Sequence, residues 1–243
     1  MGNAITDIIL ILYGDRADLD RCVASIKEHC HDYNILIHDN NRKNIGFTAA
    51  CNKLIESSTG KYCWLLNQDA ILINSDSQQA LIDRLESDDK IGAVGSQQLD
   101  PKNPDRIAFG GTPVGPGSCF PAGRHLGGLV SMGHCRIPMK VTWLNGASMM
   151  FSRRIYEEIG PLDDDLFLLY SDSDYSYRIR QAGYSCYYEP ASKVYHTLGK
   201  ASKSSAEWQQ KDMAAFMKKW GIQALPDGRF IYSREFQKLD MFP

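Results

Sequence analysis

The sequence has no excess of charge of either sign. Its 243 residues carry 27 lysines and arginines against 29 aspartates and glutamates, for a formal net charge of -2. This balance gives no argument for nucleic acid as a partner, since nucleic-acid-binding domains concentrate basic residues. The composition, 43% hydrophobic and 23% charged, is that of a globular protein and does not indicate disorder.

Long apolar runs and paired cysteines are also missing. No stretch approaches the ~18 apolar residues of a membrane-spanning helix, and residues 1–7 lack the basic and apolar regions of a signal peptide. The seven cysteines are scattered along the chain and form no CxxC pair. We therefore expect a cytoplasmic protein with reduced cysteines that is neither exported nor membrane-spanning.

No glycine-rich phosphate loop follows the first apolar run. A dinucleotide-binding domain needs GxGxxG at that point and a P-loop needs GxxxxGK, whereas this chain has Tyr13-Gly14-Asp15-Arg16. A nucleotide ligand must therefore be held in another way.

The first hundred residues alternate between strand and helix patterns. Apolar runs of strand length occur at 8–13, 35–37, 62–66 and 91–94. Helical spacing occurs at 19–26, at 48–54, where Thr48 is the expected N-cap, and at 80–85. This alternation predicts an α/β fold with a parallel, doubly wound sheet.

Acidic side chains follow three of the predicted strands, at Asp15, Asp39 and Asp69. Ligands of doubly wound sheets bind beyond the carboxyl ends of the strands. In an extended segment Asn67 and Asp69 share a face, while Gln68 points the other way. A carboxylate beside an amide suits Mg²⁺ or Mn²⁺. Asn and Asp also favour turns, so this short motif alone leaves both interpretations open.

Two longer motifs resemble the inverting glycosyltransferases of family 2, in particular the rhamnosyltransferase-like branch. The stretch NIGFTAACNKLIESSTGKYCWLLNQDA from Asn44 is similar to that family's N-x-G-F, A-x-G-x-Y and L-N-P-D series. Residues 142–184 are similar to its W-x-x-G-A-x-M series followed by Y-E-D-x-D-x-x-x-R, and KVYHTLGKAS from Lys193 is similar to its closing V-x-H-x-x-G-x-S. The resemblance covers residues 5–203.

The resemblance implies a GT-A fold, which is a Rossmann-like, doubly wound, mostly parallel sheet with an acceptor-side subregion and a C-terminal helix. We expect a single domain over residues 1–243. It would consist of a nucleotide-sugar-binding half (1–100), an acceptor and catalytic half (101–203), and a C-terminal helix and tail (204–243).

The resemblance also implies the site residues. Those expected to bind the nucleotide-sugar are Tyr13, Asp15, Asp39, Asn40, Asn44, Gly46, Phe47, Asn52, Asn67, Gln68 and Asp69. Those expected on the acceptor side are Trp143, Asn145, Gly146, Ala147, Asp174 and Arg178. Asp69 and His196 are the implied ligands of a Mn²⁺ or Mg²⁺ ion.

Two aspartates, Asp172 and Asp174, stand in the first turn of a predicted helix. Residues two apart on a helix point about 200° apart, so the two carboxylates cannot face one pocket. Asp174 stands at ion-pair spacing from Arg178, which leaves Asp172 as the candidate general base. The alternative is that Asp172 only caps the helix.

The implied reaction moves a sugar from a UDP- or dTDP-linked donor to a hydroxyl of a glycan or lipid-linked acceptor, as in polysaccharide biosynthesis, by an inverting single displacement. The family usually has glutamate where this chain has Ser171, proline at Gln68 and asparagine at Gly14. These departures motivate an alternative, a catalytically silent nucleotide-sugar-binding protein of the same fold.

Three further segments carry weaker signals. The segment 100–140, rich in glycine and proline, is either the rim of a sugar pocket or a surface excursion. The acids 163–165 follow a helix end and are expected in an exposed turn. The predicted helix between Ser204 and Gly221 has aromatic and basic residues, so it either packs on the catalytic domain or contacts the inner face of a membrane peripherally. The sequence indicates no oligomeric state.

Overall fold

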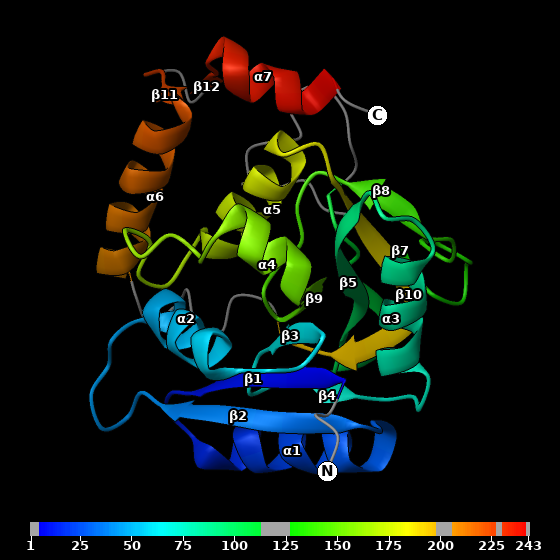
Figure 1. Ribbon diagram of the computed structural model, residues 1–243. Helices are drawn as coiled ribbons and strands as arrows, with labels where there is room; N and C mark the ends of the chain where they lie inside the picture. Colours follow the sequence, from blue (N-terminus) through cyan, green and yellow to red (C-terminus); the bar gives the residue numbers. More distant parts are fainter. Residues whose placement is uncertain (1–4, 113–126, 198–205, 227–229, 242–243) are drawn as a thin grey trace.

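A computed structural model describes residues 5–112, 127–197, 206–226 and 230–241. It is an α/β protein in which helices cover both faces of a large sheet (Figure 1). The strands are β1 (Thr6–Leu12), β2 (Tyr33–Asp39), β3 (Tyr62–Leu66), β4 (Ile71–Leu72), β5 (Ile91–Asp100), β6 (Asn103–Phe109), β7 (Gly128–Leu129), β8 (Met139–Val141), β9 (Ser148–Ser152), β10 (Ser185–Tyr195), β11 (Gln223–Ala224) and β12 (Phe230–Ile231). The helices are α1 (Arg16–His29), α2 (Phe47–Ser57), α3 (Ser77–Glu86), α4 (Arg153–Ile159), α5 (Ser171–Gln181), α6 (Ala206–Trp220) and α7 (Arg234–Met241).

The main sheet has the strand order β2-β1-β3-β9-β5-β10-β4. The strands β2, β1, β3, β5 and β10 run in one direction, and β9 runs against them between β3 and β5. The expected doubly wound, mostly parallel sheet is therefore confirmed. Its centre contains one strand, β9, that the alternation of the first hundred residues could not predict.

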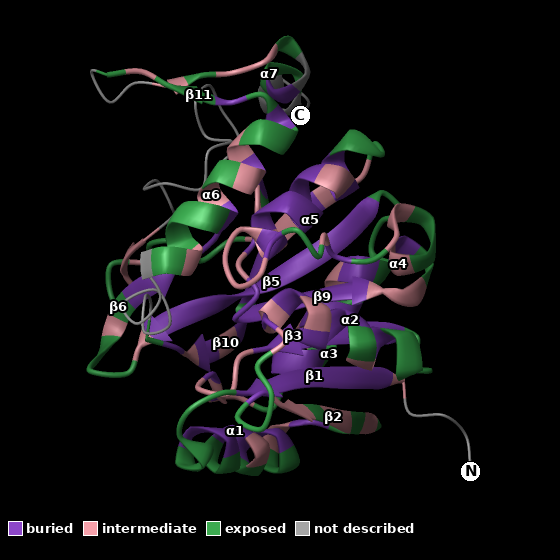
Figure 2. Cartoon of the chain, turned by 90° about the vertical axis from the view of Figure 1, so that its left-hand side faces the viewer, coloured by how far each residue is buried: buried purple, intermediate pink, exposed green. Residues whose placement is uncertain are grey.

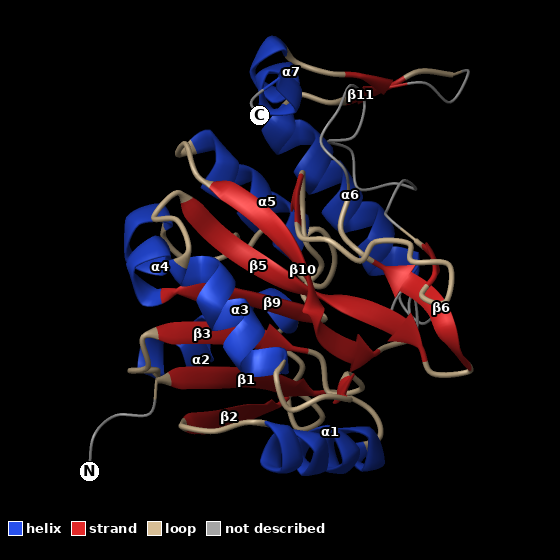
Figure 3. Ribbon diagram, turned by 90° about the vertical axis from the view of Figure 1, so that its right-hand side faces the viewer, coloured by secondary structure: helices blue, strands red, loops and turns tan. Residues whose placement is uncertain are grey.

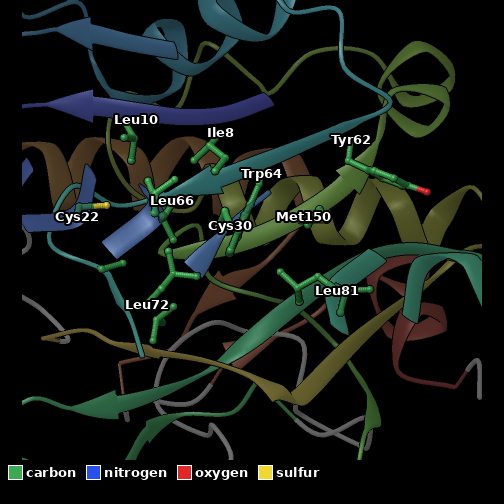
Figure 4. Close-up of a cluster of buried hydrophobic side chains, with 14 of the residues drawn as sticks. Ile8, Leu10, Cys22, Cys30, Tyr62, Trp64, Leu66, Leu72, Leu81 and Met150 are labelled. Atoms are coloured by element: carbon green, nitrogen blue, oxygen red, sulfur yellow. The ribbon is translucent and has the colours of Figure 1, made fainter. Parts of the chain in front are cut away.

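The central strands are buried on both faces, as Figure 2 shows. All seven residues of β1 and all five of β3 are buried, which is why residues 8–12 and 62–66 are unbroken apolar runs rather than alternating ones. On one face α1 and α3 complete a cluster that includes Leu10, Trp64 and Leu81 (Figures 3 and 4). On the other face α2, α4 and α5 complete a second cluster around Phe151 and Tyr175.

The C-terminal helices pack on the second half of the molecule. Tyr177 of α5, Phe216 and Trp220 of α6, and Phe236 of α7 form a third buried cluster of aromatic rings. The predicted packing of the helix before Gly221 is therefore confirmed. The helix α7 and the β11–β12 hairpin had no recognisable signal in the sequence. Within the described parts of the chain, no helix is long and apolar enough to cross a membrane.

Two expectations need correction or completion. Thr48 does not cap α2, because the N-cap is Gly46 and no side chain caps the helix; the buried Thr48 hydroxyl has no hydrogen-bond partner. The glycine- and proline-rich segment contains the strands β6, β7 and β8, and its middle, residues 113–126, lies outside the described residues, as do residues 198–202 of the closing motif.

Candidate active site

The parallel strands bring their carboxyl ends to one edge of the sheet. Asp15 and Asp69 follow β1 and β3, Asp39 is the last residue of β2, and His196 follows β10 directly. Gln98 lies near the end of β5, which pairs with β10 in parallel. Residues from distant parts of the sequence therefore gather at this edge, as expected for a ligand site on a sheet of this kind.

Asp69 and His196 lie together at this edge. The Oδ1 atom of Asp69 is 3.6 Å from Nε2 of His196, and both side chains are largely buried. The amide nitrogen of Asn67 is 3.3 Å from the same Nε2 atom. Asn67 and Asp69 thus lie next to the same imidazole ring.

The donor set of this pair fits a divalent cation. One carboxylate oxygen and one imidazole nitrogen are ligands that Mn²⁺ accepts. Among the described residues no group of three or more His, Cys, Asp or Glu side chains could hold a metal ion. Within the described parts of the chain this pair would supply two ligands, and other donors would complete the shell.

The turn 145–147 connects this pair to Asp172. Leu66 of β3 pairs with Ser148 of β9, which places the turn beside Asn67, and the backbone N–H of Asn67 donates to the carbonyl of Ala147 at 3.1 Å. From the same turn, the N–H of Gly146 donates to Oδ2 of Asp172 at 2.8 Å.

Asp172 is partly buried at the start of α5. Burial raises the pKa of its carboxyl above the usual range, and hydrogen bonds from the backbone N–H groups of Gly146 and Ser173 act in the opposite direction. Asp172 is not the N-cap of α5, which is Tyr170 in the left-handed conformation (φ 66°), but its carboxylate accepts from the first-turn N–H of Ser173 at 2.7 Å. A carboxylate with a raised pKa is a better proton acceptor than an ordinary one.

The sequence matches the model of the family described as "Glycosyltransferase like family 2" over residues 2–214. The chain belongs to this family.

Comparison with known proteins gives a curated relative and two solved structures. The relative, the uncharacterized protein y4gI of Sinorhizobium fredii, is 26% identical over 164 residues, which are 62% of this chain but 17% of that protein. The mannosyltransferase PcManGT of Pyrobaculum calidifontis, solved with GDP-Man and Mn²⁺, has a TM-score of 0.63 at 14% identity and covers 99% of this chain and 69% of its own. GalNAc-T7, solved with UDP, GalNAc and Mn²⁺, has a TM-score of 0.61 at 14% identity and covers 79% of this chain and 43% of its own. These likenesses establish the GT-A fold.

In this family 2 chain the loop after β1 is held by two side-chain amides. Gln68 accepts from the N–H of Tyr13 at 2.9 Å and donates to its carbonyl at 2.6 Å. Asn41 makes the same pair of bonds with Gly14, at 2.8 and 3.1 Å. Residues 67–70 form a turn, closed by the N–H of Ala70 donating to the carbonyl of Asn67 at 2.9 Å, so the extended geometry expected for residues 67–69 is wrong and the turn interpretation is confirmed. The structure gives Gln68 a positioning contact. Asn41 was missed, although it belongs to the polar run that ends β2.

The loop between β2 and α2 is braced by its own polar residues. Asn40 bonds to Ile45 and Gly46, Asn44 accepts from the N–H of Gly46, and Asp39 accepts from the N–H of Asn41. Asp15 caps α1 by accepting from the N–H of Ala17.

Other predicted residues contact the acceptor half. The side-chain amide of Asn52 bonds to both backbone groups of Leu162 and to Asp164. Phe47 would lie 3.6 Å from a Cβ at Gly146 and so borders the turn 145–147. These side chains position the loops around the site; contact with a nucleotide remains a prediction for each of them.

Asp174 lies away from the Asp172 site, as the helical geometry predicts. It is fully buried and accepts from Nε of Arg178 at 3.0 Å, from the indole of Trp220 and from Nζ of Lys219. The predicted ion pair is therefore present. Trp143 packs against Phe109 with ring centroids 5.1 Å apart. Of the acids 163–165, Asp164 and Asp165 are exposed as expected, and Asp163 pairs with Lys219.

Asp212 of α6 is a supporting residue that the sequence did not reveal. Its buried carboxylate accepts hydrogen bonds from the backbone N–H groups of Phe167, Leu168 and Leu169, at 2.8 to 2.9 Å. This segment leads into Tyr170 and Asp172. A C-terminal helix thereby fixes the chain that presents the candidate base.

Proposed function

We propose that this chain transfers a sugar from a nucleotide-sugar, UDP- or dTDP-linked, to a hydroxyl of a glycan or lipid-linked acceptor, with inversion at the anomeric carbon. One observation supports the proposal: the turn 145–147 contacts Asn67, which adjoins His196 and Asp69, through the carbonyl of Ala147, and contacts the carboxylate of Asp172 through the N–H of Gly146. A donor diphosphate and an acceptor hydroxyl could thus meet at this turn.

Asp172 would act as the general base. As the acceptor oxygen forms its bond to the anomeric carbon, its proton passes to the Asp172 carboxylate. The bond from the anomeric carbon to the diphosphate oxygen breaks at the same time, and its electron pair stays on the diphosphate. Attack from the face opposite the leaving group inverts the configuration.

Asp69 and His196 would hold the diphosphate end through a cation. A bound Mn²⁺ or Mg²⁺ ion supplies neutralisation of the charge that develops on the leaving group. Asn67 adjoins this pair, and the loop containing Tyr13 and Asp15 lies at the same edge of the sheet. We place the nucleotide against this loop and the loop after β2.

The choice of donor needs a direct test. A panel of UDP-, dTDP- and GDP-sugars should be screened by thermal shift with and without Mn²⁺, because a ligand of the native state raises the melting temperature. The stabilising donor is then incubated with Mn²⁺ and candidate acceptors, and release of free nucleotide is measured. Proton NMR of the product gives the anomeric configuration.

The outcomes separate an enzyme from a binding protein. Nucleotide release that needs Mn²⁺ and gives a product of inverted configuration supports the proposal. Stabilisation by a nucleotide-sugar without any nucleotide release would favour the silent binding protein that Ser171 suggests. Retained configuration, or full activity in the presence of a chelator, would refute the mechanism.

A further inference from the structure

We propose that Gln98 is a positioning residue that sets the tautomer of His196 and ties the cation-binding pair to the turn 145–147. The inference rests on the proposed function for the role of His196 as a metal ligand. Gln98 is 1% exposed, and its amide lies between the imidazole of His196 and the side chain of Asn145.

The two amides face each other as a closed pair. Gln98 Nε2 donates to Asn145 Oδ1 at 2.7 Å, and Asn145 Nδ2 donates to Gln98 Oε1 at 3.2 Å. Such a pair would be equally satisfied with both amides turned over, so it does not fix its own orientation. A third group has to do so.

The backbone N–H of Ala147 fixes the orientation. It lies 2.9 Å from Oδ1 of Asn145, and a backbone N–H can only donate. The atom of Asn145 at that place is therefore the oxygen. Since Gln98 contacts the same oxygen, it must present its NH₂ group there, which directs Oε1 of Gln98 towards His196.

The imidazole tautomer follows from this orientation. Oε1 of Gln98 lies 3.1 Å from Nδ1 of His196, and because an amide oxygen can only accept, Nδ1 must carry the proton. In the neutral ring Nε2 then presents its lone pair, next to Asp69 and to the NH₂ group of Asn67. This is the form of histidine that binds a metal ion through Nε2.

The same amide serves the acceptor side. By holding Asn145, Gln98 supports the turn whose next residue, Gly146, donates to Asp172. A single buried side chain therefore joins the two parts of the proposed site. We expect loss of this link to affect Mn²⁺ binding and acceptor use separately.

The variants Q98M and Q98E separate the two contacts. Methionine has a similar length and removes the contacts with His196 and with Asn145. Q98M should therefore lose the fixed tautomer. It should also weaken Mn²⁺ binding about 10- to 100-fold, the usual effect of removing a residue that hydrogen-bonds to a metal ligand. One carboxylate oxygen of glutamate can still accept from Nδ1 of His196. The other oxygen faces Oδ1 of Asn145, and two acceptors cannot form a hydrogen bond. Q98E should keep the tautomer and the Mn²⁺ affinity and raise KM for the acceptor. If Q98E does not fold, N145A tests the same contact.

The chain provides a matched control at the preceding position, Gln97. Gln97 is 2% exposed on the same strand, and its amide bonds to the hydroxyl of Tyr188 at 2.6 Å instead of to His196. The Q97M variant creates the same buried change without touching the imidazole. It should leave the tautomer and the Mn²⁺ affinity at their wild-type values.

The measurements are long-range ¹H–¹⁵N spectra of the histidine rings at alkaline pH, assigned with H196A, and Mn²⁺ titrations followed by electron paramagnetic resonance. A proton on Nδ1 of wild-type His196 that is lost in Q98M and kept in Q97M supports the proposal. A proton on Nε2 in the wild type, or identical spectra and Mn²⁺ affinity for Q98M and the wild type, would overturn it. Unchanged Mn²⁺ affinity in H196A would instead refute the metal site of the proposed function, while the spectra would still decide whether Gln98 sets the tautomer.

Discussion

The N–H of Gly146 donates a 2.8 Å hydrogen bond to the carboxylate of Asp172, although the two residues are 26 positions apart. A Cβ at residue 146 would stand 3.7 Å from the Cβ of Asp172, so the turn and the start of α5 are in close contact. The bond holds one carboxylate oxygen in place at the boundary between the two halves of the site. The chemistry proposed for Asp172 depends on this contact.

Replacing Asp172 with asparagine should lower kcat about 10²- to 10⁴-fold, the usual contribution of a general base. Asparagine keeps an oxygen that can accept from Gly146, so the turn should remain in place. Donor binding, measured by calorimetry, should stay near the wild-type value while nucleotide release is lost. D165N, which changes an exposed aspartate in the preceding loop, is the control. A D172N enzyme with wild-type kcat would exclude Asp172 as the base.

The stability of the same variant relative to the wild type should rise with pH, from a starting value that is lowered because asparagine has one oxygen for the two N–H groups of Gly146 and Ser173. Because the pKa of Asp172 is raised in the folded protein, its contribution to stability is present below the unfolded pKa of about 3.9 and is lost as pH rises through the folded value. Asparagine does not ionise and avoids this loss. The melting temperature of D172N minus that of the wild type should rise between pH 3 and pH 8. A constant difference over this range would contradict the raised pKa.

Removing the clamp on the Tyr13 loop should weaken donor binding. The side chain of Gln68 makes two hydrogen bonds with the backbone of Tyr13, and without them the loop must be ordered by the donor itself. We expect Q68A to reduce donor affinity by about 1–2 kcal/mol, or fivefold to thirtyfold. Titration calorimetry would measure this change, with Q79A on the exposed face of α3 as control. Equal affinities of Q68A and wild type would show that the loop does not contact the donor.

Much of the fold could be predicted from the sequence because its central strands are buried on both faces. The run Tyr62–Leu66 is a strand with the bounds that its apolar residues suggest. The strand β9 could not be placed in this way, since its position between β3 and β5 depends on pairing with Trp64 and Val94, which are distant in sequence. Local patterns carry no information about such pairing.

The site residues also fall into those that the sequence could predict and those that it could not. The residues Asp69, Asp172 and His196 could be proposed because they stand in motifs with a family resemblance. Gln98 and Asp212 could not, because each has an ordinary sequence context and acts only through contacts made by folding. The contact of Gln98 with His196 joins residues 98 positions apart, and that of Asp212 with Phe167 joins residues 45 positions apart.

Replacing Gly46 with alanine should destabilise the protein more than the same change at Gly160. Both glycines have a φ near +90°, which strains any other residue by about 1–3 kcal/mol. A Cβ at residue 46 would also lie 2.7 Å from the carbonyl oxygen of Phe167, whereas nothing lies within 4 Å of one at residue 160. Urea unfolding of G46A and G160A would therefore measure backbone strain with and without a clash. Equal losses would show that the Phe167 loop moves freely.

Replacing Asp212 with asparagine should loosen the chain that leads into Asp172. The carboxylate accepts three backbone N–H groups, two of them through Oδ2, whereas an amide has one oxygen and turns its NH₂ group towards a donor. At least one buried N–H would lose its partner, at a cost of about 1–3 kcal/mol. Urea unfolding should show this loss, and kcat should fall because the loop also positions Asp172. E207Q on the same helix, an exposed residue that pairs with Lys211, should leave stability and kcat near their wild-type values. If D212N matched E207Q in both measurements, α6 would have no part in shaping the site.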